Sequence, residues 1–147
     1  MFDVPDLTPF PKFGQKASSL LTSIAWVSRG LRPSMGAVPR DVYDRLCLLV
    51  RTPWERLPPL HALNCPVCVF HPEMTGKRLV VIPGQGTLYV CPDLITHFVN
   101  AHGYTPPEVF CDAVLNSPLP TDASFNDAIM NQGGREFLSI LAESVAA

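Results

Sequence analysis

The stretch RLVVIPGQGTLYVCPDLITHFVNAHG, residues 78–103, decides the fold. Its two runs rich in strand-forming residues, 78–82 and 87–90, flank Pro83-Gly84-Gln85-Gly86, which is typical of a hairpin with a four-residue turn. A helix is expected to follow from about Asp93 to His102. Asp93 would lie in its first turn, where a negative charge suits the helix dipole, and Gly103 would end it. This stretch therefore predicts strand, turn, strand and helix in succession.

Four possible metal ligands flank the hairpin, two before it and two after it. CPVC, residues 65–68, has the C-x2-C spacing with which two thiolates hold one zinc ion, and Pro66 favours the turn between them. His97 and His102 follow on the predicted helix. Residues five apart on a regular helix point about 140° apart, so the last turn before Gly103 must tighten or loosen for both imidazoles to converge. The sequence predicts a Zn²⁺ site formed by Cys65, Cys68, His97 and His102.

Other interpretations of the four residues stay open. A C-x2-C pair can be a redox pair, and two histidines on an apolar helix can be core residues. His61, His71 and Cys91 lie close in sequence and could replace one of the ligands. If the Cys2His2 set holds, it is coordinatively closed, which favours a structural zinc. The module would then be a stretched relative of the ββα or treble-clef zinc finger.

Helices are expected on both sides of this module. The first is predicted at 18–29, and a second from Pro39 to about Pro53, with Cys47 packed in the core beside its apolar stripe. Thr105 is expected to cap a third helix that runs to about Leu115, in a capping box with Glu108 and with Pro106 in the first position. Two short helices are predicted at 124–131 and 135–145, divided by Gly133-Gly134.

These elements predict an α+β fold in one small domain. Residues 1–16 would be an extended, proline-punctuated arm, either loosely packed or docked through Phe2, Phe10 and Phe13. Residues 17–147 would form a single domain with the zinc-binding module, 53–118, at its centre.

The composition limits the possible functions. The chain has 147 residues, an apolar fraction of 47% and a net charge of −2, so it can bury a core but has no general attraction for nucleic acid or anionic membranes. No segment is expected to be a signal peptide or to span a bilayer. Five cysteines, an odd number, indicate a reducing compartment. We expect a cytoplasmic protein.

A longer pattern carries a family resemblance. Pro53-Trp54, His61, Cys65-x2-Cys68 and then VIPGQGTLYVCPDLITHFVNAHGYTPPEVFCDAVLNSP resemble a group of uncharacterised bacterial proteins over residues 53–118. The resemblance implies that the cysteine pair and both histidines belong to one module, and it implies no activity. The chain departs from the pattern in two places: His61 is further from Cys65, and Cys91 replaces an alanine.

A non-enzymatic interaction or regulatory protein with a structural zinc fits these features best, and its partner is expected to be another protein. Tyr104 and the Tyr89 face are candidate contacts, although such aromatics more often pack against an adjacent helix. Nucleic-acid binding is an alternative, but residues 93–102 offer only Thr96 and Asn100 to read bases. A zinc-dependent or thiol enzyme is a further alternative, with Glu73 or Asp93 as conceivable bases.

Overall fold

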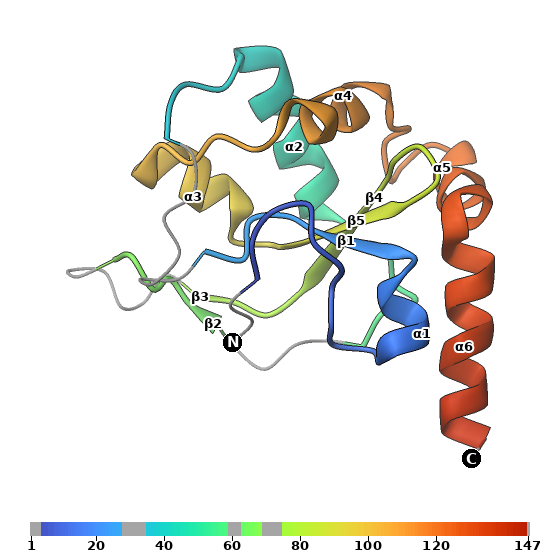
Figure 1. Cartoon of the computed structure of the whole chain (residues 1–147). Coiled ribbons are helices and arrows are strands. Elements are labelled where there is room, and N and C mark those ends of the chain that lie inside the picture. The colour runs from blue at the N-terminus through green and yellow to red at the C-terminus, as the bar shows by residue number, and fades with distance from the viewer. Residues whose placement is uncertain (1–3, 28–34, 59–62, 69–74, 147) are drawn as a thin grey trace.

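The protein folds into a mixed α+β domain, as predicted. The computed structural model describes residues 4–27, 35–58, 63–68 and 75–146. The elements in chain order are α1 (Gln15–Ser18), β1 (Leu21–Ser23), α2 (Arg40–Arg51), β2 (Leu63–Asn64), β3 (Thr75–Gly76), β4 (Leu79–Pro83), β5 (Leu88–Pro92), α3 (Ile95–His102), α4 (Glu108–Asn116), α5 (Ser124–Ile129), the π-helical turn η1 (Met130–Gly134) and α6 (Arg135–Ala146). Figure 1 shows α2, α3 and α4 on one side of the sheet, α1 on the other and α6 along one end.

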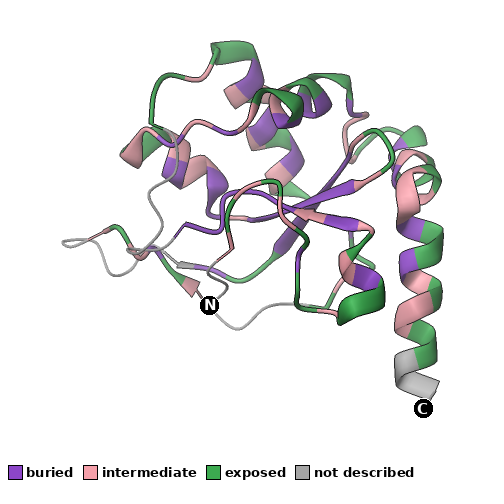
Figure 2. Cartoon of the chain, in the orientation of Figure 1, coloured by how far each residue is buried: buried purple, intermediate pink, exposed green. Residues whose placement is uncertain are grey.

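The predicted hairpin is confirmed and forms the centre of the fold. β4 and β5 pair antiparallel from Leu79↔Pro92 to Pro83↔Leu88, so the turn is residues 84–87, one residue later than predicted. The Gly84 N–H closes it by donating to the Thr87 carbonyl over 2.9 Å. Every residue of both strands is buried, which Figure 2 shows as continuous purple ribbon. Burial on both sides explains their unbroken apolar runs.

The helix predicted at 18–29 is wrong. Residues 21–23 form β1, which pairs parallel with β5 in the sheet order β1-β5-β4, and the Ile24 N–H continues the pairing by donating to Val90. Leu21, Ile24 and Val27, which lie at helical spacing, are indeed buried, but so are Ser23, Ala25 and Trp26 between them. A segment buried on all sides carries no period that separates strand from helix.

The N-terminal arm docks on its own domain. Leu7 and Phe10 donate backbone hydrogen bonds to Ser23 and Leu21, and the Ser23 N–H donates to Thr8, so the arm runs antiparallel along the outer edge of β1. Phe10 is fully buried and stacks on Trp26 with 5.0 Å between the ring centroids. The arm thus covers an edge that would otherwise expose unpaired backbone groups. Phe2 lies outside the described residues.

The second predicted helix is confirmed as α2, which begins directly after Pro39. Its buried residues Val42, Leu46 and Leu49 face the core. Cys47 is only partly buried, so its predicted core position is wrong. Its place next to Leu46 puts it at the margin of the apolar stripe rather than inside it.

The helices after Gly103 also follow the prediction, but the predicted N-terminal cap of α4 does not form. α4 begins at Glu108 with Pro107 before it and has no side-chain cap, so the capping box of Thr105 is wrong. Two consecutive prolines hold the chain extended there and move the helix start beyond the reach of Thr105. α5 and α6 are confirmed, separated by a kink at which Gly133 has φ 117°. Within the described residues, no helix has the length and apolar character needed to cross a membrane.

Candidate metal centre

The cysteine pair follows the first strand of a small two-stranded sheet that the sequence did not predict. β2 and β3 pair antiparallel through Leu63↔Gly76 and Asn64↔Thr75, and Cys65 follows β2 directly. Cys65 is 6% exposed, and Cys68 is partly buried. Strands of two residues are too short to be stable alone, so other contacts must hold this sheet in place.

Gly76 and Asp93 provide these contacts. A Cβ atom on Gly76 would lie 2.1 Å from Asp93 Oδ1 and 2.9 Å from Leu94 Cγ, so β3 lies directly against the residues that precede α3. The Lys77 N–H donates to Asp93 Oδ2 over 3.3 Å, and the Asp93 N–H donates to the Arg78 carbonyl over 3.1 Å. Asp93 was predicted in the first turn of the helix, which is wrong. It precedes the helix and tethers β3 to it.

The histidines both project from α3, which is confirmed as the predicted helix and ends at Gly103 in a left-handed conformation with φ 67°. The Gly103 N–H donates to Phe98, five residues earlier rather than four. A bond of this span widens the last turn. His97 lies in the first turn of α3, and His102 is its last residue. The two imidazole rings converge where the last turn of the helix is widened. The ring centroids are 4.9 Å apart and the ring planes are nearly perpendicular, at 88°.

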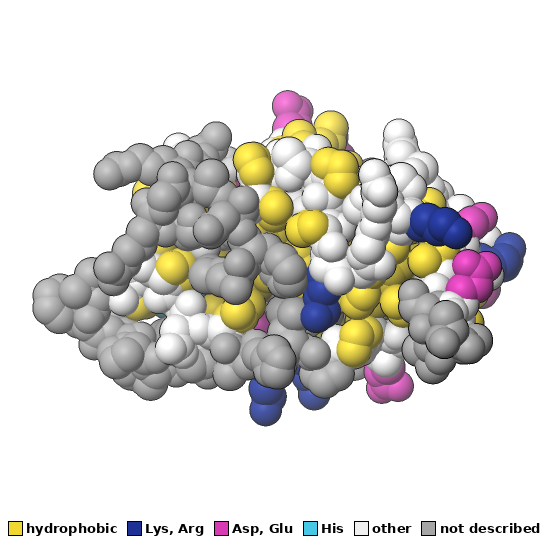
Figure 3. Space-filling model, turned by 60° about the horizontal axis from the view of Figure 1, so that its bottom comes forward, with side chains coloured by type: hydrophobic (Ala, Val, Ile, Leu, Met, Phe, Trp, Pro, Cys, Tyr) yellow, Lys and Arg dark blue, Asp and Glu magenta, His cyan; other side chains and the backbone are white. Residues whose placement is uncertain are grey.

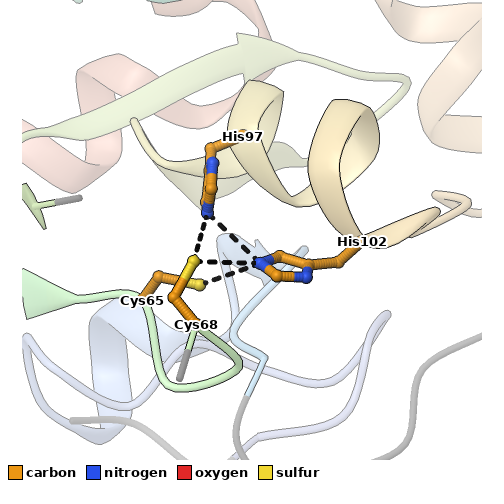
Figure 4. A group of neighbouring side chains, drawn as sticks. All are labelled: Cys65, Cys68, His97 and His102. Atoms are coloured by element: carbon orange, nitrogen blue, oxygen red, sulfur yellow. Dashed lines mark hydrogen bonds between the residues drawn. The ribbon is translucent and has the colours of Figure 1, made fainter. Parts of the chain in front are cut away.

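The four side chains meet at one point (Figure 4). Their donor atoms all lie within 4.8 Å of one another. Cys68 Sγ is 3.1 Å from His97 Nε2 and 3.3 Å from His102 Nε2, Cys65 Sγ is 3.4 Å from His102 Nε2, and the two Nε2 atoms are 3.2 Å apart. A tetrahedral zinc with bonds of about 2.3 Å to sulfur and about 2.05 Å to nitrogen places S and N about 3.6 Å apart and two N atoms about 3.3 Å apart. The measured separations are shorter than these values by at most about 0.5 Å, so the four residues could hold a zinc ion.

Hydrogen bonding alone cannot explain this arrangement. His102 Nε2 lies within 3.4 Å of three other possible metal-ligand atoms, the Sγ atoms of Cys65 and Cys68 and the Nε2 atom of His97. A ring nitrogen either donates one hydrogen or accepts through one lone pair. At most one of the three approaches can thus be a hydrogen bond of His102. A cation between the four atoms would satisfy all of them, so the group could hold a metal ion.

Residues 2–115 match the family described as "Domain of unknown function (DUF7919)". The chain belongs to this family. The match includes all four residues of the metal centre and also the N-terminal elements, which the sequence resemblance left out. Searches of curated proteins and of solved structures give no match.

Within the DUF7919 domain, Cys91 stands apart from the donor group. It lies in β5 and is fully buried. Burial raises the pKa of its thiol, and the charges of Asp93 and Asp6 raise it further. A raised pKa disfavours the thiolate that metal binding needs. Cys91 therefore remains a core residue, while His61 and His71 lie outside the described residues.

Gly76 is the part of this centre that sequence reasoning missed. It has no side chain, and its role depends on the close approach of Asp93 and Leu94, which follow it by 17 and 18 positions. No local pattern marks such a contact. The available signal was the isolated glycine between the cysteine pair and the hairpin, because a glycine beside a strand often marks a close approach of two backbones.

Proposed function

We propose that Cys65, Cys68, His97 and His102 bind one Zn²⁺ ion and that the ion is structural. The observation that carries this proposal is the convergence of the four ligand atoms, which all lie within 4.8 Å of one another and approach as closely as 3.1–3.4 Å in four of the pairs, near the edge lengths of a zinc tetrahedron. Two thiolates and two imidazoles fill all four positions. Such a set leaves no vacancy for the activated water of a catalytic zinc.

The proposed ion has a clear structural task. It joins the segment after β2 to α3, two parts of the chain that are otherwise connected through the short β2–β3 sheet and the contact between Gly76 and Asp93. Because a structural site forms only in the folded chain, the binding free energy of zinc adds to the stability of the fold.

We further propose that the zinc module presents a contact for another protein and that the protein acts in the cytoplasm without enzymatic activity. The candidate contacts named from sequence do not serve this role, since Tyr104 is 1% and Tyr89 is 8% exposed. Tyr104 donates to Asp6, and Tyr89 packs edge-on against Phe110. Val67 supports the proposal instead, because this apolar residue lies between the two cysteines and is 37% exposed.

The surface favours a protein partner over nucleic acid. On the face shown in Figure 3, basic and acidic side chains are interspersed around a middle of hydrophobic and uncharged ones. Binding to a phosphate backbone needs a concentration of positive charge. Asp93, before the start of α3, would oppose a phosphate there.

The metal site and the interaction role are tested separately. Elemental analysis of the purified chain should give one zinc per chain, and the midpoint of thermal unfolding should fall when a chelator removes it. Affinity capture should then compare the zinc-loaded wild type with Val67→Asp. A partner protein lost by Val67→Asp at unchanged zinc content supports the interaction role. Binding to mixed DNA or RNA with a steep salt dependence would replace that role with nucleic-acid binding.

A further inference from the structure

A cavity of about 470 Å³ lies at the other end of the hairpin, between its turn, α4 and the junction of α5 with η1. Figure 1 shows these three parts next to one another. The cavity and the metal centre are separate. β5 separates them: it begins at Leu88, beside the turn, and ends at Pro92, before α3. Its length as extended chain is roughly 13 Å.

The walls of the cavity are held in place by specific contacts. Gln132 Oε1 accepts from the Gly86 N–H over 2.7 Å, which ties the kink after α5 to the hairpin turn. A Cβ atom on Gly84 would lie 2.6 Å from the Tyr89 ring, so the turn lies directly on this ring. The Tyr89 ring in turn packs edge-on against the ring of Phe110 in α4, with 5.6 Å between the ring centroids. All three walls are therefore fixed relative to one another, as in preformed ligand sites.

The lining is polar but carries almost no charge. It presents four side-chain amides, one carboxylate and one phenol, those of Gln85, Asn116, Asn131, Gln132, Asp112 and Tyr89. None of the described residues that line it is basic. Pro83, Val109 and Pro118 add apolar surface.

The hydroxyl of Tyr89 is a hydrogen-bond donor that the wall of the cavity offers to a ligand. The residue is 8% exposed, and its hydroxyl makes no hydrogen bond with any residue in the described part of the chain. Burial raises the pKa of this phenol, so the hydroxyl keeps its proton at neutral pH and remains a donor. The ring is buried, but the hydroxyl itself is open to solvent, so it can donate to a molecule that enters the cavity.

We propose that this cavity binds a small, uncharged, polyhydroxylated molecule of the carbohydrate class. Side-chain amides both donate and accept, which matches neighbouring hydroxyl groups, and the apolar surfaces can cover the C–H face of a sugar ring. Among the described residues that line the cavity, no basic side chain would attract an anionic ligand. The one acidic side chain among them, Asp112, is exposed at the rim, where water and salt screen its attraction for a cationic ligand.

The test is a titration of the full, zinc-loaded chain, followed by the backbone amide signals in NMR. The probes are glucose, galactose, N-acetylglucosamine, sucrose and myo-inositol, with glucose 6-phosphate as the anionic and putrescine as the cationic comparison. At least one uncharged probe should give saturable shifts at Gly84, Gly86 and Gln132, and should bind more tightly than both charged molecules.

Variants assign the binding to the cavity. Tyr89→Phe keeps the ring but removes the hydroxyl, and Asn131→Ala removes one amide; each should weaken binding about fivefold, as expected for one hydrogen bond. Asn100→Ala removes an exposed amide on α3, away from the cavity, and should bind as the wild type does. Absence of saturable shifts with all five uncharged probes, preference for a charged molecule, or unchanged affinity in Tyr89→Phe and Asn131→Ala would overturn the proposal. Zinc content tests the metal centre separately.

Discussion

Substituting Gly76 by alanine should weaken zinc binding without touching a ligand. The new methyl group would lie 2.1 Å from Asp93 Oδ1, about 1.3 Å closer than ordinary van der Waals contact. Rotation of the Asp93 side chain cannot relieve the whole clash, because Leu94 Cγ lies 2.9 Å away and Leu94 is buried. β3 must therefore move away from α3, and it carries β2 and the cysteine pair with it.

The size of the effect follows from the coupling between this strain and the metal. Overpacking costs about 1–3 kcal/mol. In the metal-free protein the β2–β3 sheet can shift to relieve the strain, but bound zinc holds it against α3, so the strain lowers the zinc affinity. We expect a loss of about tenfold, which corresponds to about 1.4 kcal/mol. Competition for zinc with a chromophoric chelator measures the zinc affinity of both proteins.

Gly86→Ala is the matched control. Gly86 has φ 76°, but a Cβ atom there would meet nothing within 4 Å. The substitution should lower the free energy of unfolding by about 1–2 kcal/mol through backbone strain alone and leave the zinc affinity unchanged. If Gly76→Ala binds zinc as tightly as the wild type, the contact between Gly76 and Asp93 does not position the cysteines.

Three further predictions concern the ligands, the core and the arm. Cys68→Ser or His97→Ala should lose zinc and stability together; where free zinc stands at about 1,000 times its Kd, the loss is about 4 kcal/mol, measured by chemical unfolding. Stability should fall in alkali, because burial raises the pKa of the Cys91 thiol and of the Tyr104 hydroxyl in the folded state. The folded chain keeps both groups neutral while the unfolded chain ionises them, so each group costs about 1.4 kcal/mol per pH unit above its ordinary pKa. Phe10→Ala should destabilise the fold by about 3–5 kcal/mol, measured by thermal unfolding, because it empties a fully buried position.

Each of these predictions has its own contradicting result. Zinc retained at full stoichiometry by both Cys68→Ser and His97→Ala would remove these residues from the ligand set. In Cys91→Ala the decline between the ordinary pKa values of cysteine and tyrosine should be shallower, although Cys111, whose pKa burial also raises, still contributes; an unchanged profile would mean that Cys91 does not cause it. Leu7→Ala, at a site that is 49% exposed, should have little effect, and an equal loss in both arm variants would contradict the specific role of Phe10.

The centre of the fold was readable from sequence because its signals are local. The turn glycines between two runs rich in strand-forming residues predicted the hairpin, and Gly103 marked the end of α3. The four candidate ligands followed from two short motifs, and the structure brings all four together. Their convergence across 28 intervening residues (69–96) needed no knowledge of the path between them, since the hairpin returns the chain close to its starting point.

The errors arose where distant contacts decide the local structure. Residues 21–23 form a strand because β5 and the N-terminal arm pair with them on either side, and neither partner is visible in the segment itself. Asp93 has the position and charge of a helix-start residue, yet its carboxylate accepts from Lys77 on the β3 side. The cavity beside the hairpin turn was likewise not predictable, because η1 brings Gln132 to Gly86 from 46 positions away.

The most direct test of the metal centre is X-ray absorption spectroscopy at the zinc edge on protein purified without added metal. We predict one zinc per chain, bound by two sulfur atoms at about 2.3 Å and two imidazole nitrogens at about 2.0 Å, with the sulfur contribution reduced by half in Cys68→Ser if any zinc remains. Protein that is isolated without zinc and does not bind it when zinc is supplied, or zinc bound by a different set of atoms, would contradict the proposal.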